Sequence, residues 1–251
     1  MILFFSGTGN SLKIAKSTAS LLGDTKVVSI AYLRKENNLS LHDETIVIVF
    51  PVYSFGVPKL VYDFFSRKID LRAENFYAIA SCGGTPGYVN LQLKELLSSQ
   101  GHELKAGFVI TEWDKYFGRF DQKIAAAADY IGKRKSGLFE ASNSLMNAIS
   151  PFIYHGFYRG VNKMDRRFRT NHACTKCGLC IHICPVDNIE MMKSGKPAWK
   201  HNCQMCTACL QYCPNRAVEY TWISRYAPKF LFNNNKDISP TELIKQKHGY
   251  L

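Results

Sequence analysis

The sequence predicts an α/β protein: a doubly wound parallel sheet of five strands, followed by a second, small α+β domain. Two observations lead to this expectation. Between residues 1 and 138, short apolar runs of strand length alternate with longer segments whose apolar residues recur at helical spacing. From residue 169 onward, eight of the nine cysteines fall within one short stretch, which indicates a separate domain. A chain of 251 residues is long enough for both domains.

The expected strands and helices of the first domain alternate along the chain. Residues 1–5 are apolar without alternation, as in a central strand that is buried on both faces. Further strands are expected at 26–29, 44–50, 76–81 and 104–110, and helices at 12–22, 58–67, 88–99 and 122–135. Ligands of such a sheet bind at the carboxyl ends of its strands, where we expect the loops 6–11, 51–57 and 82–87 to meet.

The first of these loops, Ser6 to Ser11, is rich in glycine and hydroxyl groups and leads into a helix. Free backbone amides and the positive end of a helix bind phosphate groups. Neither G-x4-G-K-[ST] nor G-x-G-x-x-G occurs here, which disfavours a nucleoside triphosphate or a Rossmann dinucleotide. The alternative interpretation is a plain glycine turn without a ligand.

The second domain contains the pattern C-x2-C-x2-C-x3-C-P twice. The two runs consist of Cys174, Cys177, Cys180 and Cys184, and of Cys203, Cys206, Cys209 and Cys213. In this iron-sulfur pattern, three thiolates of a run hold one cluster and the fourth reaches the other cluster. Ile189-Glu190 and Val218-Glu219 extend the repeat, which indicates a duplicated half-domain. Zinc sites or a disulfide framework are the alternatives, but zinc knuckles are usually separated by about twelve or more residues.

The cysteine region resembles the two-cluster bacterial-type ferredoxins, and this resemblance implies two [4Fe-4S] clusters. It implies one cluster held by Cys174, Cys177, Cys180 and Cys213, and another held by Cys203, Cys206, Cys209 and Cys184. Together with the loops of the first domain, almost the whole chain resembles proteins in which a flavodoxin-like domain is fused to such a ferredoxin. This flavodoxin-ferredoxin resemblance implies FMN as a further cofactor.

By the same resemblance, FMN would contact the three loops at the sheet edge. The implied phosphate ligands are Ser6, Thr8, Gly9, Asn10 and Ser11. The implied neighbours of the flavin ring are Pro51, Val52, Tyr53, Ser54, Phe55, Gly56, Cys82, Gly83, Gly84 and Tyr88. Neither ring loop contains an acidic residue, so no loop carboxylate would oppose negative charge on the reduced ring. Cys82, the ninth cysteine, is interpreted as a small packing residue rather than a redox group.

The predicted organisation has four parts. They are a flavodoxin-like FMN-binding domain at 1–138, a helical basic connector at 139–168, the two-[4Fe-4S] domain at 169–222 and a tail at 223–251. Pro151 and Gly156 are expected to bend or break a continuous helix in the connector. In the tail, Ser239 to Glu242 is a capping-box sequence that predicts a short helix, and 233–236 is expected to be a loop.

Charge determines what partners we expect. The net charge is +12, and residues 133–170 contribute eight Lys or Arg against two acidic residues, which suggests an acidic redox protein such as a ferredoxin or flavodoxin. Basic charge without a recognition motif predicts no nucleic acid partner. The amphipathic connector also permits contact with a membrane surface, although internal helices usually pack on their own protein. Without a basic leader or an apolar run long enough to span a bilayer, we expect a cytoplasmic protein.

Two clusters beside a flavin predict an oxidoreductase that relays electrons between the clusters and FMN, with a small molecule or a redox protein as terminal partner. A pure electron carrier and an electron-delivery subunit of a larger complex are the alternatives. No set of His, Glu or Asp residues in the flavin loops indicates proton chemistry, so the sequence identifies neither a catalytic residue nor the substrate.

Overall fold

The structure is a computed structural model, and it describes residues 1–221 and 235–249. The central sheet has five parallel strands in the order β2-β1-β4-β6-β7. They are β1 (Ile2–Phe4), β2 (Val27–Ser29), β4 (Thr45–Pro51), β6 (Asn75–Cys82) and β7 (Leu104–Thr111). This order fits a flavodoxin-like doubly wound fold and places the switch point between β1 and β4.

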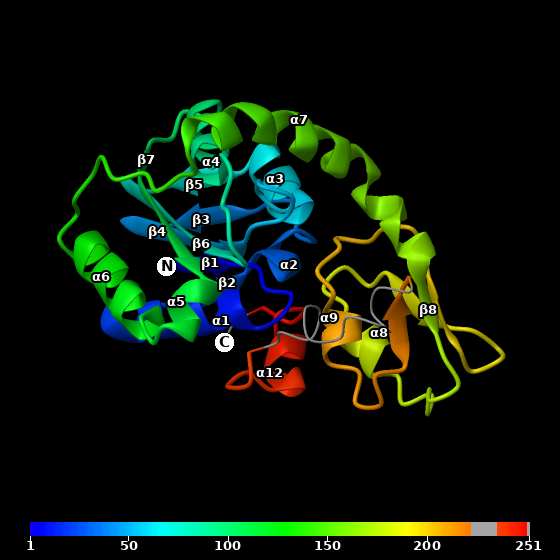
Figure 1. The fold of residues 1–251 in the computed structure, drawn as a ribbon. Helices are drawn as coiled ribbons and strands as arrows, with labels where there is room; N and C mark the ends of the chain where they lie inside the picture. Colours follow the sequence, from blue (N-terminus) through cyan, green and yellow to red (C-terminus); the bar gives the residue numbers. More distant parts are fainter. Residues whose placement is uncertain (222–234, 250–251) are drawn as a thin grey trace.

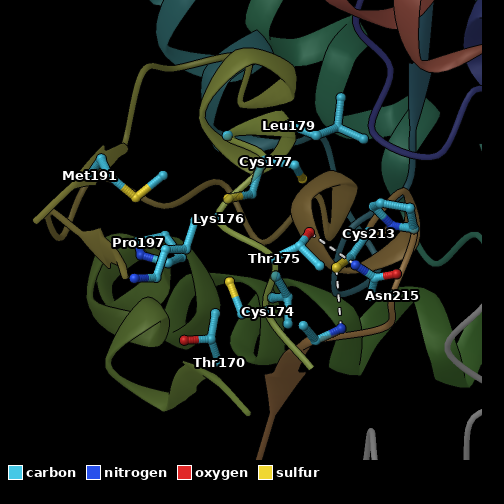
Figure 2. A pocket seen from close by; sticks show the side chains of 15 residues that line it. Thr170, Cys174, Thr175, Lys176, Cys177, Leu179, Met191, Pro197, Cys213 and Asn215 are labelled. Carbon is cyan, nitrogen blue, oxygen red and sulfur yellow. Dashed lines mark hydrogen bonds between the residues drawn. The ribbon is translucent and has the colours of Figure 1, made fainter. Parts of the chain in front are cut away.

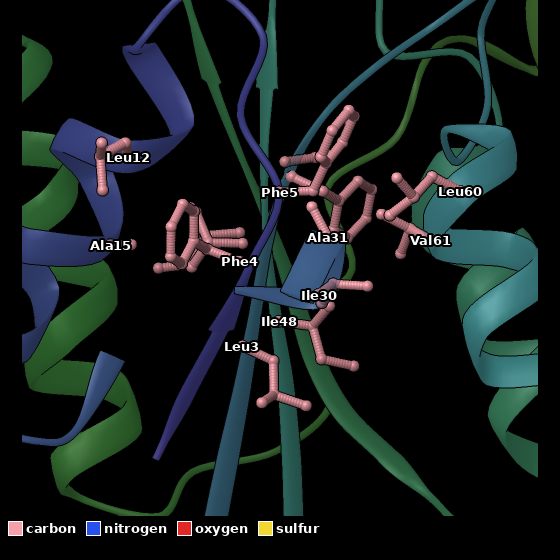
Figure 3. Packing of buried hydrophobic residues seen from close by; sticks show 14 of the residues in the cluster. Leu3, Phe4, Phe5, Leu12, Ala15, Ile30, Ala31, Ile48, Leu60 and Val61 are labelled. Atoms are coloured by element: carbon pink, nitrogen blue, oxygen red, sulfur yellow. The ribbon is translucent and has the colours of Figure 1, made fainter. Parts of the chain in front are cut away.

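Helices cover both faces of this sheet (Figure 1). On one face lie α1 (Asn10–Leu21) and α6 (Phe120–Gly132), and on the other lie α3 (Lys59–Ser66) and α4 (Val89–Ser98). Neighbouring side chains of β1 point to opposite layers: Phe4 faces α1 and Phe5 faces α3 (Figure 3). Both rings are fully buried, which explains why β1 is apolar throughout.

The five predicted strands and four predicted helices of this domain are confirmed, with ends that shift by one to three residues. The structure adds the short helices α2 (Ile30–Leu33) and α5 (Glu112–Tyr116). It also adds a parallel pair formed by β3 (Ser40–His42) and β5 (Asp70–Arg72). Only the central leucine of each of these two strands is buried, so their sequences carry too little hydrophobic pattern to predict them.

The connector is helical, as predicted, and the expected bend or break at Pro151 and Gly156 is not a break. Its helix α7 (Ser144–Gly160) runs without interruption through Pro151 and Gly156, and the 3-10 helix η1 (Val161–Arg167) follows it. Figure 1 shows α7 as a curved arch from the sheet domain to the cysteine-rich domain. The rings of Tyr154 and Tyr158 pack against that of Tyr62 in α3, and this tertiary contact holds the helix together despite the missing N–H of the proline.

The cysteine-rich domain is built from two similar halves. One half contains α8 (Leu179–Ile183) followed by β9 (Ile189–Met191), and the other contains α9 (Ala208–Gln211) followed by β11 (Val218–Tyr220). Strand β9 pairs antiparallel with β10 (Pro197–Trp199), and β11 pairs antiparallel with β8 (Phe168–Thr170). The repeated order of helix and strand agrees with the duplicated half-domain expected from the cysteine spacing.

The C-terminal segment packs between the two domains. The predicted capping box is confirmed: Ser239 and Glu242 exchange side-chain and backbone hydrogen bonds at the start of α12 (Pro240–Lys245). Ile238 and Leu243 join a hydrophobic core that is continuous from the sheet into the cysteine-rich domain. The predicted loop at 233–236 falls partly, and residues 222–234 wholly, outside the described residues. No helix in the part of the chain that the structure describes is long and apolar enough to cross a membrane.

Candidate functional site

Four cysteines from both runs surround one small cavity at the outer end of the cysteine-rich domain. This outer cysteine group consists of Cys174, Cys177, Cys180 and Cys213, and the cavity between its members measures about 20 Å³. Apolar side chains such as Leu179, Met191 and Pro197 complete the lining (Figure 2). Gly178, directly before α8, has a left-handed backbone conformation at φ 76°, which glycine adopts without steric cost.

The other four cysteines form an inner group that is more deeply buried. Cys184, Cys203, Cys206 and Cys209 are each at most 9% exposed, whereas Cys177 of the outer group is exposed. Burial, followed by the charges of Cys184 and Cys203, raises the pKa of the Cys206 thiol well above its usual range. Burial likewise raises the pKa of Cys203 to about 12. Four such thiols ionise together only when a metal centre compensates their charge, as an iron-sulfur cluster does.

Backbone amides support the sulfur atoms of both groups. The amides of Asn188 and Ala217 donate to the sulfurs of Cys184 and Cys213, at 3.3 and 3.2 Å. The amide of Met205 donates to the sulfur of Cys203 at 3.2 Å. Donors aimed at sulfur stabilise negative charge on a ligating thiolate, so this arrangement fits cluster ligands.

The geometry differs from that of a single-metal site. All nine cysteines are free thiols. Among residues 1–221 and 235–249, no three His, Cys, Asp or Glu side chains are arranged to hold one ion. Tetrahedral zinc needs ligands that converge on one point, whereas the corners of a [4Fe-4S] cube need one thiolate at each of four irons. Four cysteines around a small cavity fit the second arrangement.

A second cavity lies at the carboxyl edge of the sheet. It measures about 180 Å³ and includes parts of all three predicted loops. Its lining consists of Thr8, Asn10, Pro51, Val52, Tyr53, Ser81, Cys82, Gly83, Ile110, Thr111, Glu112 and Phe120. Eight other predicted contacts do not line it: Ser6, Gly9, Ser11, Ser54, Phe55, Gly56, Gly84 and Tyr88.

The glycine loop has a conformation that suits phosphate binding. Gly9 is left-handed, at φ 91°, and caps the start of α1. Within the described residues, the backbone N–H groups of Thr8, Asn10 and Ser11 donate to no protein acceptor. The Ser6 hydroxyl accepts from the amide of Gly9 at 3.2 Å, and the Ser11 hydroxyl bonds to that of Ser81 at 2.7 Å. The two serines therefore shape the loop, and its free amides are the groups left for an anion.

The sequence did not predict five of the residues that line this cavity, and Glu112 is the charged one among them; the others are Ser81, Ile110, Thr111 and Phe120. Glu112 follows β7, and its carboxylate accepts a hydrogen bond from the Asn10 side chain at 2.7 Å. The signal was its position, since the loop after a fifth parallel strand opens at the same edge as the other three loops. A carboxylate here opposes a phosphate dianion, so Glu112 is the one lining residue that fits FMN poorly.

The loop after β4 contains a strained turn. Tyr53 and Gly56 exchange backbone hydrogen bonds of 3.0 and 3.1 Å, and the residues between them, Ser54 and Phe55, are both left-handed, at φ 49° and 69°. Such a turn normally requires Asn and Gly. Strain of this kind concentrates at ligand and active sites. Its effect here is to hold the Tyr53 ring at the wall of the cavity.

Tyr88, expected beside the flavin, lies elsewhere. Its ring packs edge to face on Tyr154 of α7, with centroids 6.0 Å apart, and it lines a separate groove between α4 and α7. Phe55 packs against Gly87 instead of lining the cavity. Cys82 does line the cavity; burial raises the pKa of its thiol to about 11, which agrees with its interpretation as a packing residue.

The glycine loop touches the inner cysteine group directly. A Cβ atom placed on Gly7 would lie 2.4 Å from the carbonyl oxygen of Cys206 and 2.7 Å from the hydroxyl of Tyr53. Burial, followed by the charges of Cys206 and Cys203, raises the pKa of Tyr53 well above its usual range. Tyr53 therefore lies between the inner cysteine group and the cavity at the sheet edge.

The glycine loop also contacts the C-terminal segment and Tyr212, the residue that follows α9. The amide of Asn235 donates to the carbonyl oxygen of Thr8 at 2.8 Å, and the Tyr212 hydroxyl donates to the same oxygen at 3.2 Å. Gln246 accepts from the amide of Ser6 at 3.4 Å. Residues separated by more than two hundred positions thus fix the loop in place.

Comparison with known proteins identifies one part of the chain. Residues 167–214 match the family described as the 4Fe-4S dicluster domain, and this match contains all eight cysteines of the two groups. Neither the curated proteins nor the solved structures gave a match. The segment from residue 167 to residue 214 is therefore a ferredoxin-type 4Fe-4S dicluster domain.

Proposed function

We propose that this chain is an oxidoreductase that relays electrons between two [4Fe-4S] clusters and FMN. The dicluster domain supports iron-sulfur electron transfer. The clusters would supply one-electron carriers, and FMN would supply an acceptor of one or two electrons. The contact between Gly7 and Cys206 is the main support, because it joins the two candidate cofactor sites without an intervening layer of protein.

In this proposal, each cysteine group holds one cluster. The outer group is Cys174, Cys177, Cys180 and Cys213, and the inner group is Cys184, Cys203, Cys206 and Cys209. The exposed Cys177 makes the outer cluster the one that exchanges electrons with a partner. The inner group adjoins the glycine loop and Tyr53, so it exchanges electrons with the ligand of the sheet-edge cavity.

FMN would bind in that cavity with its phosphate on the amides of Thr8 and Asn10, which line it, and next to the free amide of Ser11. Tyr53 and the Cys82-Gly83 backbone would border the ring, because they line the same cavity. A Cβ atom on Gly83 would meet nothing within 4 Å, so this side of the cavity has room for a ligand. The terminal acceptor would be a small molecule or a redox protein that reaches the ring from solvent.

An acidic one-electron carrier is the proposed partner of the outer cluster. The basic residues between 133 and 170 lie in two separate places: Lys133 to Lys135 follow α6, at the opposite end of the molecule from β8 (Figure 1). Arg166 and Arg167 directly precede β8, whose Thr170 lines the outer cysteine cavity. Arg169 is less available, because it pairs with the buried Glu219 at 3.3 Å.

Salt dependence tests this partner. We expect reduction by an acidic ferredoxin to slow as ionic strength rises, because steering by charge is screened. Arg166→Glu combined with Arg167→Glu should remove most of that dependence. The matched control is Lys133→Glu combined with Lys135→Glu, which changes the charge equally at the far end. If both double variants change the salt dependence equally, or neither changes it, the docking surface lies elsewhere.

Cys184→Ser tests the relay itself. The wild-type chain, assembled without oxygen, should hold about eight irons and bind FMN. The variant should lose or alter the inner cluster in EPR spectra and keep the outer one, and electrons from the outer cluster should no longer reach FMN. Cys82→Ser, outside both groups, should leave both clusters intact. Selective loss of the outer cluster in Cys184→Ser would refute the proposed ligation.

FMN binding is tested separately at Thr8. Thr8→Asp places a carboxylate against the phosphate and should abolish binding, as measured by flavin fluorescence, while Thr8→Ser keeps the hydroxyl and should retain it. Unchanged affinity in Thr8→Asp would move the flavin away from this loop. If the wild-type chain assembles both clusters but binds no FMN, the flavin part of the proposal is wrong. The chain would then be an iron-sulfur electron carrier.

A further inference from the structure

Helix α7 leaves a row of large apolar side chains exposed to solvent. Ser150 and Tyr154 are its buried residues. Leu145, Ile149, Phe152 and Ile153 are exposed, at 68, 42, 81 and 42% of their surfaces. Their spacing of i, i+4, i+7 and i+8 places all four on one side of the helix. An ordinary surface helix buries its large apolar side chains, so this exposed apolar ridge indicates a contact surface.

The orientation of α7 is fixed by its inner face. Tyr154 packs on the rings of Tyr62 and Tyr88, with centroids 6.4 and 6.0 Å apart. The Tyr158 hydroxyl donates to Asp63 in α3, and the amino group of Lys59 lies 3.9 Å from the centre of the Tyr158 ring. If α7 rotated about its axis to bury the ridge, Tyr154 and Tyr158 would lose these contacts. Among residues 1–221 and 235–249, no side chain buries the ridge, so we look for a partner that covers it.

Shape and charge indicate what covers it. Figure 1 shows α7 as an outer arch whose outer side is convex, and a convex helix with exposed apolar side chains suits a flat surface better than a groove. Residues 141–164 contain no Asp or Glu, while His155, Arg159 and Lys163 are exposed along the same segment. A second copy of the chain would bring two positive flanks together. The ridge also lacks the Tyr, Trp and Arg anchors that are typical of protein interfaces.

We propose that α7 binds the surface of an anionic membrane. The four apolar side chains of the ridge enter the boundary between headgroups and acyl chains, and Arg159 and Lys163 lie at the level of the anionic headgroups. Apolar insertion and basic charge act together, as reversible surface binding requires. This contact is independent of FMN and of the electron partner.

Vesicle sedimentation with the cluster-loaded full chain tests the proposal. We expect binding to mixed phosphatidylglycerol and phosphatidylcholine vesicles that weakens as salt rises, and little binding to phosphatidylcholine alone. Leu145→Asp combined with Phe152→Asp should weaken binding by about tenfold to a hundredfold, because two inserted side chains are lost. Both positions are exposed, so cluster content and thermal stability should not change.

The matched control places the same two charges on other exposed apolar residues. Leu21 is 56% and Tyr116 is 79% exposed, and both lie outside α7. Leu21→Asp combined with Tyr116→Asp should bind these vesicles nearly as the wild type does. Three results would overturn the proposal: no binding to anionic vesicles, equal losses in both double variants, or unchanged binding in the α7 variant. A fourth result would favour a protein interface instead of a membrane. In that case the wild type would form a dimer or a complex with an acidic protein, the α7 variant would not form it, and neither protein would bind vesicles.

Discussion

Gly7→Ala tests whether the two domains meet as closely as the structure has them. Gly7 is not left-handed, so alanine is compatible with its backbone conformation, and the cost comes from contact alone. The added carbon would lie 2.4 Å from the carbonyl oxygen of Cys206, about 1 Å short of the 3.4 Å at which ordinary contact begins. It would also lie 2.7 Å from the Tyr53 hydroxyl, so the glycine loop and the Cys206 loop must separate.

The expected cost follows from overpacking a rigid contact. Forcing one extra carbon into a well-packed site costs about 1–3 kcal/mol. For a chain of this size, each kcal/mol lowers the melting temperature by about 2–4 °C, so Gly7→Ala should melt about 2–12 °C lower. Gly83→Ala is the matched control, because its added carbon would meet nothing within 4 Å. The control should change stability by less than about 0.5 kcal/mol.

The assay is thermal unfolding of both cluster-loaded variants under anaerobic conditions, followed by circular dichroism and by the visible absorption of the clusters. Because Cys206 belongs to the inner group, we expect the variant to lose cluster absorption at a lower temperature than the control. If Gly7→Ala has the same melting temperature as the wild type and Gly83→Ala, the glycine loop and the Cys206 loop do not touch. In that case, the main support for a relay between the two sites would be withdrawn.

Two further predictions concern the sheet-edge cavity. Glu112→Gln should tighten FMN binding by about tenfold or more, because Glu112 lines the same cavity as the phosphate loop and two like charges that share a cavity cost on the order of 2 kcal/mol. FMN titration of this variant beside Asp121→Asn, an exposed acidic control, checks this, and unchanged affinity would place the phosphate away from Glu112. Burial raises the pKa of Cys82 from 9.0 to about 11, so below pH 9 its thiolate fraction should be about a hundredfold lower than that of a free cysteine. Alkylation of Cys82 in the cluster-loaded protein can be measured by mass spectrometry, with Cys82→Ser as the control. It should be slow at pH 8 and accelerate toward pH 11. Rapid labelling at pH 8 would contradict a buried, neutral thiol.

The sequence by itself determined the elements whose pattern is local. The spacing of the eight cysteines indicated an iron-sulfur domain, because cluster geometry restricts which residues near in sequence can be ligands together. The apolar runs and helical periods predicted the five strands and four helices of the sheet domain, because strands buried on both faces and amphipathic helices differ strongly in pattern. The capping box at Ser239 and Glu242 was also legible, since its hydrogen bonds link residues three positions apart.

Only the tertiary structure decided which distant residues meet. Pro151 and Gly156 were expected to bend or break the connector; α7 is curved but unbroken, because Tyr154 and Tyr158 pack on α3, and propensity does not include such contacts. Tyr88 shares a loop with the flavin contacts implied by the resemblance, yet its ring turns toward α7, because loop membership does not determine the direction of a side chain.

The relation between the two candidate sites was likewise invisible in the sequence. Gly7 and Cys206 are 199 positions apart, and Glu112 reaches Asn10 from the start of α5, a segment that shares no motif with the glycine loop. Motif spacing describes single sites, because it rests on residues that are close along the chain. The contact between an electron-carrying domain and a ligand cavity depends on how two domains pack, and that packing is set by buried surface spread over the whole chain.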